Sequence, residues 1–134
     1  MSVVLGFVPT AAGRAALDRA VHEAAKAATT LVVVSEQRSD HGAGGAADPD
    51  TIAEVRRAAA ARDVPVELRG AADGRSAADQ LVDLSYEDDV ELLVIGLRRR
   101  SPVGKLLMGS TAQQVLLDAG CAVLSVKPPV EARA

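Results

Sequence analysis

The sequence predicts a single α/β domain built on a doubly wound, five-stranded parallel sheet. Short apolar runs alternate with helix-patterned segments along the whole chain. The apolar runs are mostly continuous, as expected for parallel strands that helices cover on both faces. The chain has 134 residues, which is enough for one domain and leaves little room for a second.

The first strand and the first helix differ in their apolar periodicity. An apolar run over residues 3–8 favours a buried strand, and Pro9 ends it. Over residues 11–28 an apolar residue recurs every three or four positions, which puts Leu17 and Val21 on one stripe of a helix.

The middle of the chain repeats this alternation. Residues 30–35 are a β-branched strand, and the alanine-rich residues 50–62 favour a helix. The polar, glycine-rich residues 36–49 between them are long for a connection, which indicates either a functional loop or a flexible one that covers a pocket. Residues 64–68 predict a weaker strand with an internal proline, which suits a sheet edge.

The last third of the chain supplies two more helices and two more strands. Ser76 and Asp79 have the spacing of a capping box, and the helix that they begin continues to about residue 86 with Ala78, Leu81, Val82 and Ser85 inward. Residues 92–95 form the fourth strand. Gly120 is suited to end the last helix, and Ala122–Val126 is the fifth strand. The apolar stripe of the last helix consists of Ala112, Val115, Leu116 and Ala119.

Composition limits the location and the partners of the protein. The net charge of −3 argues against a dedicated nucleic-acid binder. The N-terminus has no signal-peptide pattern, and no apolar stretch is long enough for a membrane span, so we expect a cytoplasmic protein.

Cys121 is the only cysteine and begins an apolar run, which favours a buried, inert thiol. We expect the domain to cover residues 1–129 and a frayed tail to cover residues 130–134.

The connection between the fourth strand and the last helix has the composition of an anion-binding site. A glycine ends the strand, a loop with three consecutive arginines follows, and a second glycine precedes two hydroxyl residues at the helix start. Glycine permits the close approach of a ligand, and a helix N-terminus supplies unpaired N–H groups with a partial positive charge. The residues concerned are Gly96, Arg98, Arg99, Arg100, Gly109, Ser110 and Thr111.

The same residues also fit a structure without a ligand. The arginines would then form a solvated basic turn, and Ser110 would be an ordinary helix cap.

A catalytic function has less support from the sequence than a binding function. Lys105 is followed by a leucine, so the Walker A pattern is missing, and no carboxylate stands at the end of a strand to hold Mg²⁺ or to activate water.

These residues and the order of the elements resemble the universal stress protein family over nearly the whole chain. Nucleotide-binding members carry a glycine, two residues, a glycine, nine residues, and then glycine with Ser or Thr. Gly96 fills the first position, Arg99 stands at the second, and Gly109 with Ser110 fills the last. The segment at residues 106–110, the helix and the Cys-Ala-Val-Leu strand after it also look like this family.

The resemblance implies an adenine nucleotide alpha hydrolase-like sheet with the strand order 3-2-1-4-5. It implies that ATP, or else AMP or ADP, binds at the carboxyl ends of strands 1 and 4, with the role of Mg²⁺ open. The protein would be a stress-response regulator and not an enzyme, and it would form a homodimer through Ala122–Val126. The expected nucleotide-binding residues are Phe7, Val8, Pro9, Thr10, Val34, Ile95, Gly96, Arg98, Arg99, Ser101, Gly109, Ser110 and Thr111.

Two departures from the family pattern leave an alternative open. Val8, Pro9 and Thr10 stand where the nucleotide binders usually have an aspartate followed by Gly-Ser or a similar pair. Arg99 replaces a glycine, and its side chain either blocks the phosphates or pairs with them. The alternative is a dimeric interaction protein of the same family that binds no nucleotide.

Overall fold

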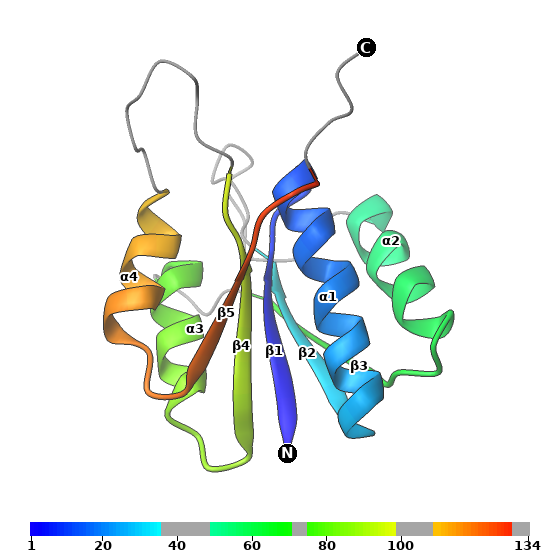
Figure 1. The fold of residues 1–134 in the computed structure, drawn as a ribbon, viewed down its shortest axis with the longest axis horizontal. Coiled ribbons are helices and arrows are strands. Elements are labelled where there is room, and N and C mark those ends of the chain that lie inside the picture. Colours follow the sequence, from blue (N-terminus) through cyan, green and yellow to red (C-terminus); the bar gives the residue numbers. More distant parts are fainter. Residues whose placement is uncertain (36–48, 71–74, 99–108, 130–134) are drawn as a thin grey trace.

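The computed structural model describes residues 1–35, 49–70, 75–98 and 109–129. In these ranges strands and helices alternate and form three layers, with the sheet between α1 and α2 on one side and α3 and α4 on the other (Figure 1). The elements are β1 (Ser2–Phe7), α1 (Ala11–Ala27), β2 (Thr30–Ser35), α2 (Pro49–Ala60), β3 (Val66–Arg69), α3 (Ala77–Ser85), β4 (Val90–Gly96), α4 (Ser110–Asp118) and β5 (Ala122–Val126).

The sheet has the predicted topology. All of its strands are parallel, and their order is β3-β2-β1-β4-β5. The chain moves outward from β1 to β2 and β3, and then crosses back to β4 on the other side of β1. This reversal is the topological switch point, and the crevice beyond the carboxyl ends of β1 and β4 is where open parallel sheets usually bind ligands.

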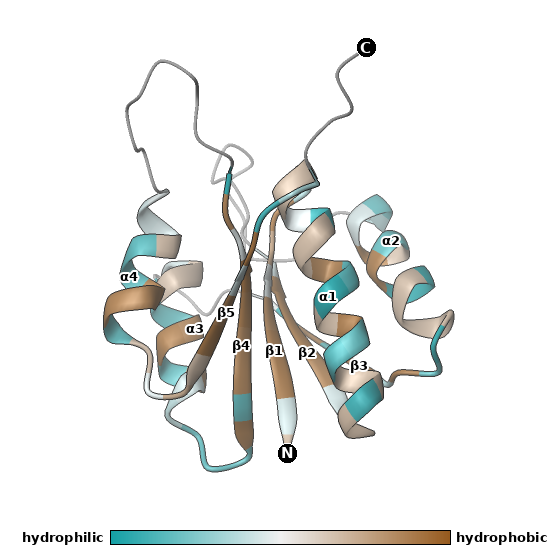
Figure 2. Ribbon diagram, viewed as in Figure 1, coloured by the Kyte–Doolittle hydropathy of each residue, from teal (hydrophilic) through white to brown (hydrophobic). Residues whose placement is uncertain are grey.

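The two faces of the sheet bury different residues of each strand. In β1, Val3, Leu5 and Phe7 pack in the core that contains α1, whereas Val4 packs in the core that contains α3 and α4. The strands are apolar along most of their length, in agreement with burial on both faces (Figure 2). Since side chains alternate along a strand, Val8 continues the face of Val4.

Most of the predicted element bounds agree with the structure to within two residues. β2 and β5 have the expected bounds, and β3 is an edge strand as predicted. Pro65 precedes β3 and does not lie inside it, so its missing N–H costs no hydrogen bond in the sheet. Among the helices described, none is both long and apolar enough to cross a membrane.

The inward faces of the last two helices differ from the prediction. On α3, Val82 is partly buried and packs against the core, in agreement with its predicted inward position, and Leu84, which was not predicted to lie inward, is buried. On α4, Ala112 and Val115 are buried, but Leu116 is 40% exposed and Leu117 is 75% exposed. The buried apolar stripe of α4 is therefore narrower than the stripe of apolar residues in its sequence.

Gly120 follows α4 as predicted, but not because the chain needs a left-handed conformation there. The helix ends at Ala119 with extended backbone angles, and no positive φ occurs at Gly120. A Cβ atom at Gly120 would lie 2.5 Å from two ring carbons of Tyr86. The Tyr86 hydroxyl donates to the Asp118 carbonyl at 2.8 Å, and the Ser85 hydroxyl accepts from the Gly120 N–H at 2.9 Å. Gly120 thus lets the end of α3 close onto the end of α4.

The start of α1 lies tightly against the ends of β1 and β4. A Cβ atom at Gly13 would lie 1.6 Å from the Val8 carbonyl oxygen. A Cβ atom at Gly96 would lie 2.5 Å from the Ala12 carbonyl oxygen. Both glycines are therefore required for this contact between backbones, in addition to any role of Gly96 toward a ligand.

We predict that Gly13→Ala destabilises the protein. Alanine in place of glycine normally favours a helix by about 1 kcal/mol. At Gly13 the added methyl group would overlap the Val8 carbonyl, so we expect the free energy of unfolding to fall by about 1–3 kcal/mol in urea denaturation. Asp18→Ala, at an exposed position of the same helix, should change it by less than about 0.5 kcal/mol. A Gly13→Ala protein as stable as the wild type would contradict this packing.

Candidate functional site

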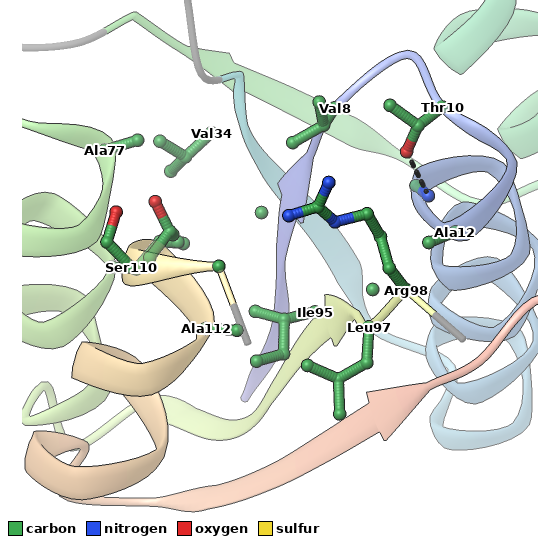
Figure 3. A pocket seen from close by; sticks show the side chains of 16 residues that line it. Val8, Thr10, Ala12, Val34, Ala77, Ile95, Leu97, Arg98, Ser110 and Ala112 are labelled. Carbon is green, nitrogen blue, oxygen red and sulfur yellow. Dashed lines mark hydrogen bonds between the residues drawn. The ribbon is translucent and has the colours of Figure 1, made fainter. Parts of the chain in front are cut away.

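A cavity of about 770 Å³ opens beyond the carboxyl ends of β2, β1 and β4. Figure 3 shows the start of α1 on one side of it and the starts of α3 and α4 on the other. Its volume is in the range of pockets that hold small organic ligands, about 300–1,000 Å³. The described residues that line it are Gly6, Val8, Thr10, Ala12, Gly13, Val34, Ala77, Leu81, Ile95, Gly96, Leu97, Arg98, Gly109, Ser110, Thr111 and Ala112.

Most of the residues predicted to bind a nucleotide meet at this cavity. Those that line it are Val8, Thr10, Val34, Ile95, Gly96, Arg98, Gly109, Ser110 and Thr111. Pro9 is exposed in the turn between β1 and α1 and is not among the lining residues. Arg99 and Ser101 lie outside the described residues, so their predicted role stays a prediction.

Phe7 lies on the other face of the sheet and does not line the cavity. It is 1% exposed and packs with residues of α1 such as Leu17. The alternation of side chains along β1 explains this placement, since Phe7 shares a face with Leu5, whereas Val8 continues the face of Val4. The same alternation, applied to the sequence, would have separated Phe7 from Val8.

Several lining residues were not predicted from the sequence: Gly6, Ala12, Gly13, Ala77, Leu81, Leu97 and Ala112. Gly6 carried a usable signal, since a glycine inside a strand often marks a close approach of another group. A Cβ atom there would lie 2.7 Å from the Leu81 Cδ1 atom. The other residues are small or apolar and come from α1, α3, α4 and the residue after β4, and only the fold brings them together at the cavity.

Part of the lining is polar and positively charged. Gly109 is the N-cap of α4 and provides no side-chain cap, and the first turn of the helix contains no acidic residue. Ser110 and Thr111 add hydroxyl groups at this helix start, and the Arg98 side chain extends over the cavity toward Val8 (Figure 3). An open helix start and a guanidinium group in one cavity favour an anion.

The rest of the lining is mostly apolar. Val34, Ala77, Leu81 and Ile95 are buried, and Val8 is partly exposed to the cavity. Among the described lining residues Arg98 is the only one with a charged side chain. The described part of the chain also contains no group of three or more His, Cys, Asp or Glu residues that could hold a metal ion. The arrangement fits a ligand with an anionic end and a flat or apolar end.

A polar contact ties the start of α3 to α4 beside the cavity. The Asp79 carboxylate accepts from Nε2 of Gln114 at 2.7 Å. Ser76 caps α3 as predicted, because its hydroxyl accepts from the Asp79 N–H at 3.1 Å. The hydrogen bond from Gln114, followed by those from Ser76, lowers the pKa of Asp79 below its usual value. The charged form of Asp79 therefore helps to hold the two helices together.

The sequence matches the model of the universal stress protein family over residues 2–127. This match spans nearly the entire chain. The chain belongs to the universal stress protein family. A curated member of the family, the universal stress protein of Mycolicibacterium smegmatis, is 37% identical over 127 residues, which cover 94% of this chain and 97% of the relative.

Solved structures of universal stress proteins share the fold. One from Archaeoglobus fulgidus is 27% identical, with a TM-score of 0.72 over 95% of this chain and 98% of its own. A universal stress protein in complex with cAMP is 24% identical, with a TM-score of 0.71 over 96% and 98%. A universal stress protein from Archaeoglobus fulgidus in complex with dAMP is 22% identical, with a TM-score of 0.65 over 95% of this chain and 98% of its own. These structures confirm the adenine nucleotide alpha hydrolase-like fold.

We predict that Asp79 makes the stability of the protein depend on pH. Because its pKa is lower in the folded state, its contribution is complete above the unfolded pKa of about 3.9 and is lost as the pH falls through the folded value. The free energies of unfolding of the wild type and Asp79→Asn should therefore differ more at pH 7 than at pH 3. Gln114→Ala should show the same trend, and a difference that stays constant with pH would exclude this role.

Proposed function

We propose that this protein binds an adenine nucleotide, with ATP as the expected ligand and AMP or ADP as alternatives, in the cavity beyond β1 and β4. The observation that carries the proposal is a lining that combines an arginine and an open helix start with apolar side chains. A nucleotide has the same two parts, a phosphate group and a planar base. The volume of about 770 Å³ is sufficient for such a ligand.

We propose that the polar part of the lining holds the phosphates. They face the start of α4, where Gly109, Ser110 and Thr111 provide backbone N–H and hydroxyl groups, and Arg98 adds a positive charge. The base then contacts apolar lining residues such as Val34. The family supports this proposal, since one universal stress protein of the same fold has been solved with cAMP and another with dAMP.

The proposed role is regulation and not catalysis. Among the described residues that line the cavity, none has a carboxylate or an imidazole that could take a proton from water. We propose a cytoplasmic stress-response regulator that responds to a bound nucleotide, in which any hydrolysis of ATP is slow and incidental.

We further propose that the protein is a homodimer through β5. This strand is at one edge of the sheet, with Ala122 exposed and Val123 and Leu124 partly buried. The neighbouring Leu117 on α4 is 75% exposed. An apolar edge strand of this kind is usually covered by a partner. The second candidate function, a dimeric interaction protein without a nucleotide, is favoured by Val8, which lines the cavity where the nucleotide-binding pattern has an aspartate.

We predict that the purified protein binds ATP or AMP in calorimetric titration and that Arg98→Ala weakens the binding. Arg98 is exposed over the cavity, and a hydrogen bond to a charged group contributes about 1.5–3 kcal/mol, so the dissociation constant should rise at least tenfold. Arg56→Ala removes an exposed arginine on α2, away from the cavity, and should leave the dissociation constant unchanged. Titration with and without Mg²⁺ measures the part played by the metal.

The opposite result has a clear meaning. If the protein binds none of the adenine nucleotides up to millimolar concentration and releases none on heat denaturation, the interaction protein becomes the better account.

We predict that light scattering at micromolar concentration gives twice the chain mass of 13.8 kDa. The apolar edge of β5 is the physical reason, since its unpaired backbone groups and its side chains are both covered in a dimer. A mass equal to that of one chain would contradict the dimer and would leave the nucleotide proposal unaffected.

A further inference from the structure

α4 is held against the rest of the molecule mainly by α3. Among the described elements, α3 is the one that α4 contacts most extensively. Of the residues of α4, Ala112 and Val115 are buried, whereas Leu116 and Leu117 are exposed. The two buried side chains are short, and apolar contacts have no preferred direction. This packing therefore attaches α4 to the domain without fixing the exact position of its first turn.

Directional contacts fix the far end of α4 to the end of α3. The Tyr86 hydroxyl donates to the Asp118 carbonyl, and the Gly120 N–H donates to the Ser85 hydroxyl. The ring of Tyr86 also lies where a Cβ atom of Gly120 would be. The cavity is at the other end of the helix, where residues 109–112 line it. A second directional contact is needed to keep the first turn from tilting about the far end.

The hydrogen bond between Gln114 and Asp79 is such a contact. Nε2 of Gln114 donates to Oδ1 of Asp79 at 2.7 Å, and both residues are partly buried. Gln114 follows Ser110 by four residues, so the two lie on one side of the helix, about 6 Å apart along its axis. Neither Gln114 nor Asp79 is among the described residues that line the cavity. The pair is thus close to the helix start without belonging to the lining.

Asp79 is itself fixed at the start of α3. The Ser76 hydroxyl accepts from the Asp79 N–H at 3.1 Å. The hydrogen bond from Gln114, followed by those from Ser76, keeps the pKa of Asp79 below its usual value, so the carboxylate is charged near neutral pH. A charged acceptor makes a shorter and stronger hydrogen bond than a neutral one. The capped start of α3 therefore gives the Gln114 amide a firm point of attachment.

We infer that Asp79 and Gln114 are positioning residues of the proposed nucleotide site. Their hydrogen bond sets the first turn of α4 at the distance and angle at which its N–H and hydroxyl groups bind an anion. The inference rests on the proposed function and assigns to the site two residues outside its described lining. Hydrogen bonds weaken steeply with poor alignment, and a site that is about 1 Å too loose loses function although all of its residues are present. Loss of the pair therefore weakens binding without removing a residue of the lining.

The experiment compares the dissociation constant of AMP in three proteins by calorimetric titration. Gln114→Ala should raise it about three- to tenfold, the effect of one hydrogen bond. Alanine favours a helix, so this variant should fold. Tyr86→Phe removes a hydrogen bond between the same two helices at the far end of α4. Both variants should lower the free energy of unfolding in urea, but Tyr86→Phe should leave the dissociation constant within twofold of the wild type.

The possible failures have different meanings. Equal dissociation constants in the wild type and Gln114→Ala would overturn the inference and leave the proposed function intact. The same rise in Gln114→Ala and Tyr86→Phe would also overturn it, because any loosening of α4 would then be sufficient. If the wild type binds no AMP at millimolar concentration, the proposed function fails and the inference fails with it.

An exchanged pair separates the hydrogen bond from the Gln114 side chain itself. The double variant Asp79→Asn with Gln114→Glu places the amide on α3 and the carboxylate on α4, so a hydrogen bond forms in the reverse direction and the net charge is unchanged. The lengths of both side chains are also retained. We expect the dissociation constant of AMP to stay within twofold of the wild type. A dissociation constant as high as in Gln114→Ala would overturn the role of the pair as a positioning contact.

Discussion

The close contact of α1 with the ends of β1 and β4 is the constraint on which the site depends. Gly13 meets the Val8 carbonyl, and Gly96 meets the Ala12 carbonyl, at distances that leave no room for side chains. This contact holds the start of α1 at the carboxyl ends of the neighbouring strands β1 and β4. It also fixes the direction of Val8, whose carbonyl faces α1 while its methyl groups face the cavity.

The chemistry of the cavity follows from which elements end at this edge. Val8 after β1 and Val34 near the end of β2 give this part of the lining an apolar character. α4 covers the edge of the sheet, and its start is open to solvent and can carry hydroxyl groups. A ligand at the switch point therefore meets both apolar side chains and a polar helix start.

The sequence was sufficient for the fold but only partly so for the site. Strand and helix periodicity gave the element order, and the resemblance to the family gave the strand order that the structure confirms. The glycine-serine helix start was found because its signal is local. The prediction that Phe7 lines the cavity is wrong because side chains alternate along β1, and Phe7 lies on the face that packs against α1. The sequence predicts Gly120 as a helix stop, whereas the structure shows that it makes room for the ring of Tyr86. Such contacts join residues distant in the chain, and no local pattern contains them.

The most direct test of a nucleotide site at the start of α4 is a titration with AMP followed by the backbone amide resonances of the protein. This account predicts that the signals of Ser110, Thr111 and Ala112 shift most, since their N–H groups belong to the open first turn of the helix, and that Gly6 and Val8 shift with them. Signals at the other edge of the sheet, such as Glu67 in β3, should stay in place. Saturable shifts confined to β5, or none at millimolar AMP, would contradict it.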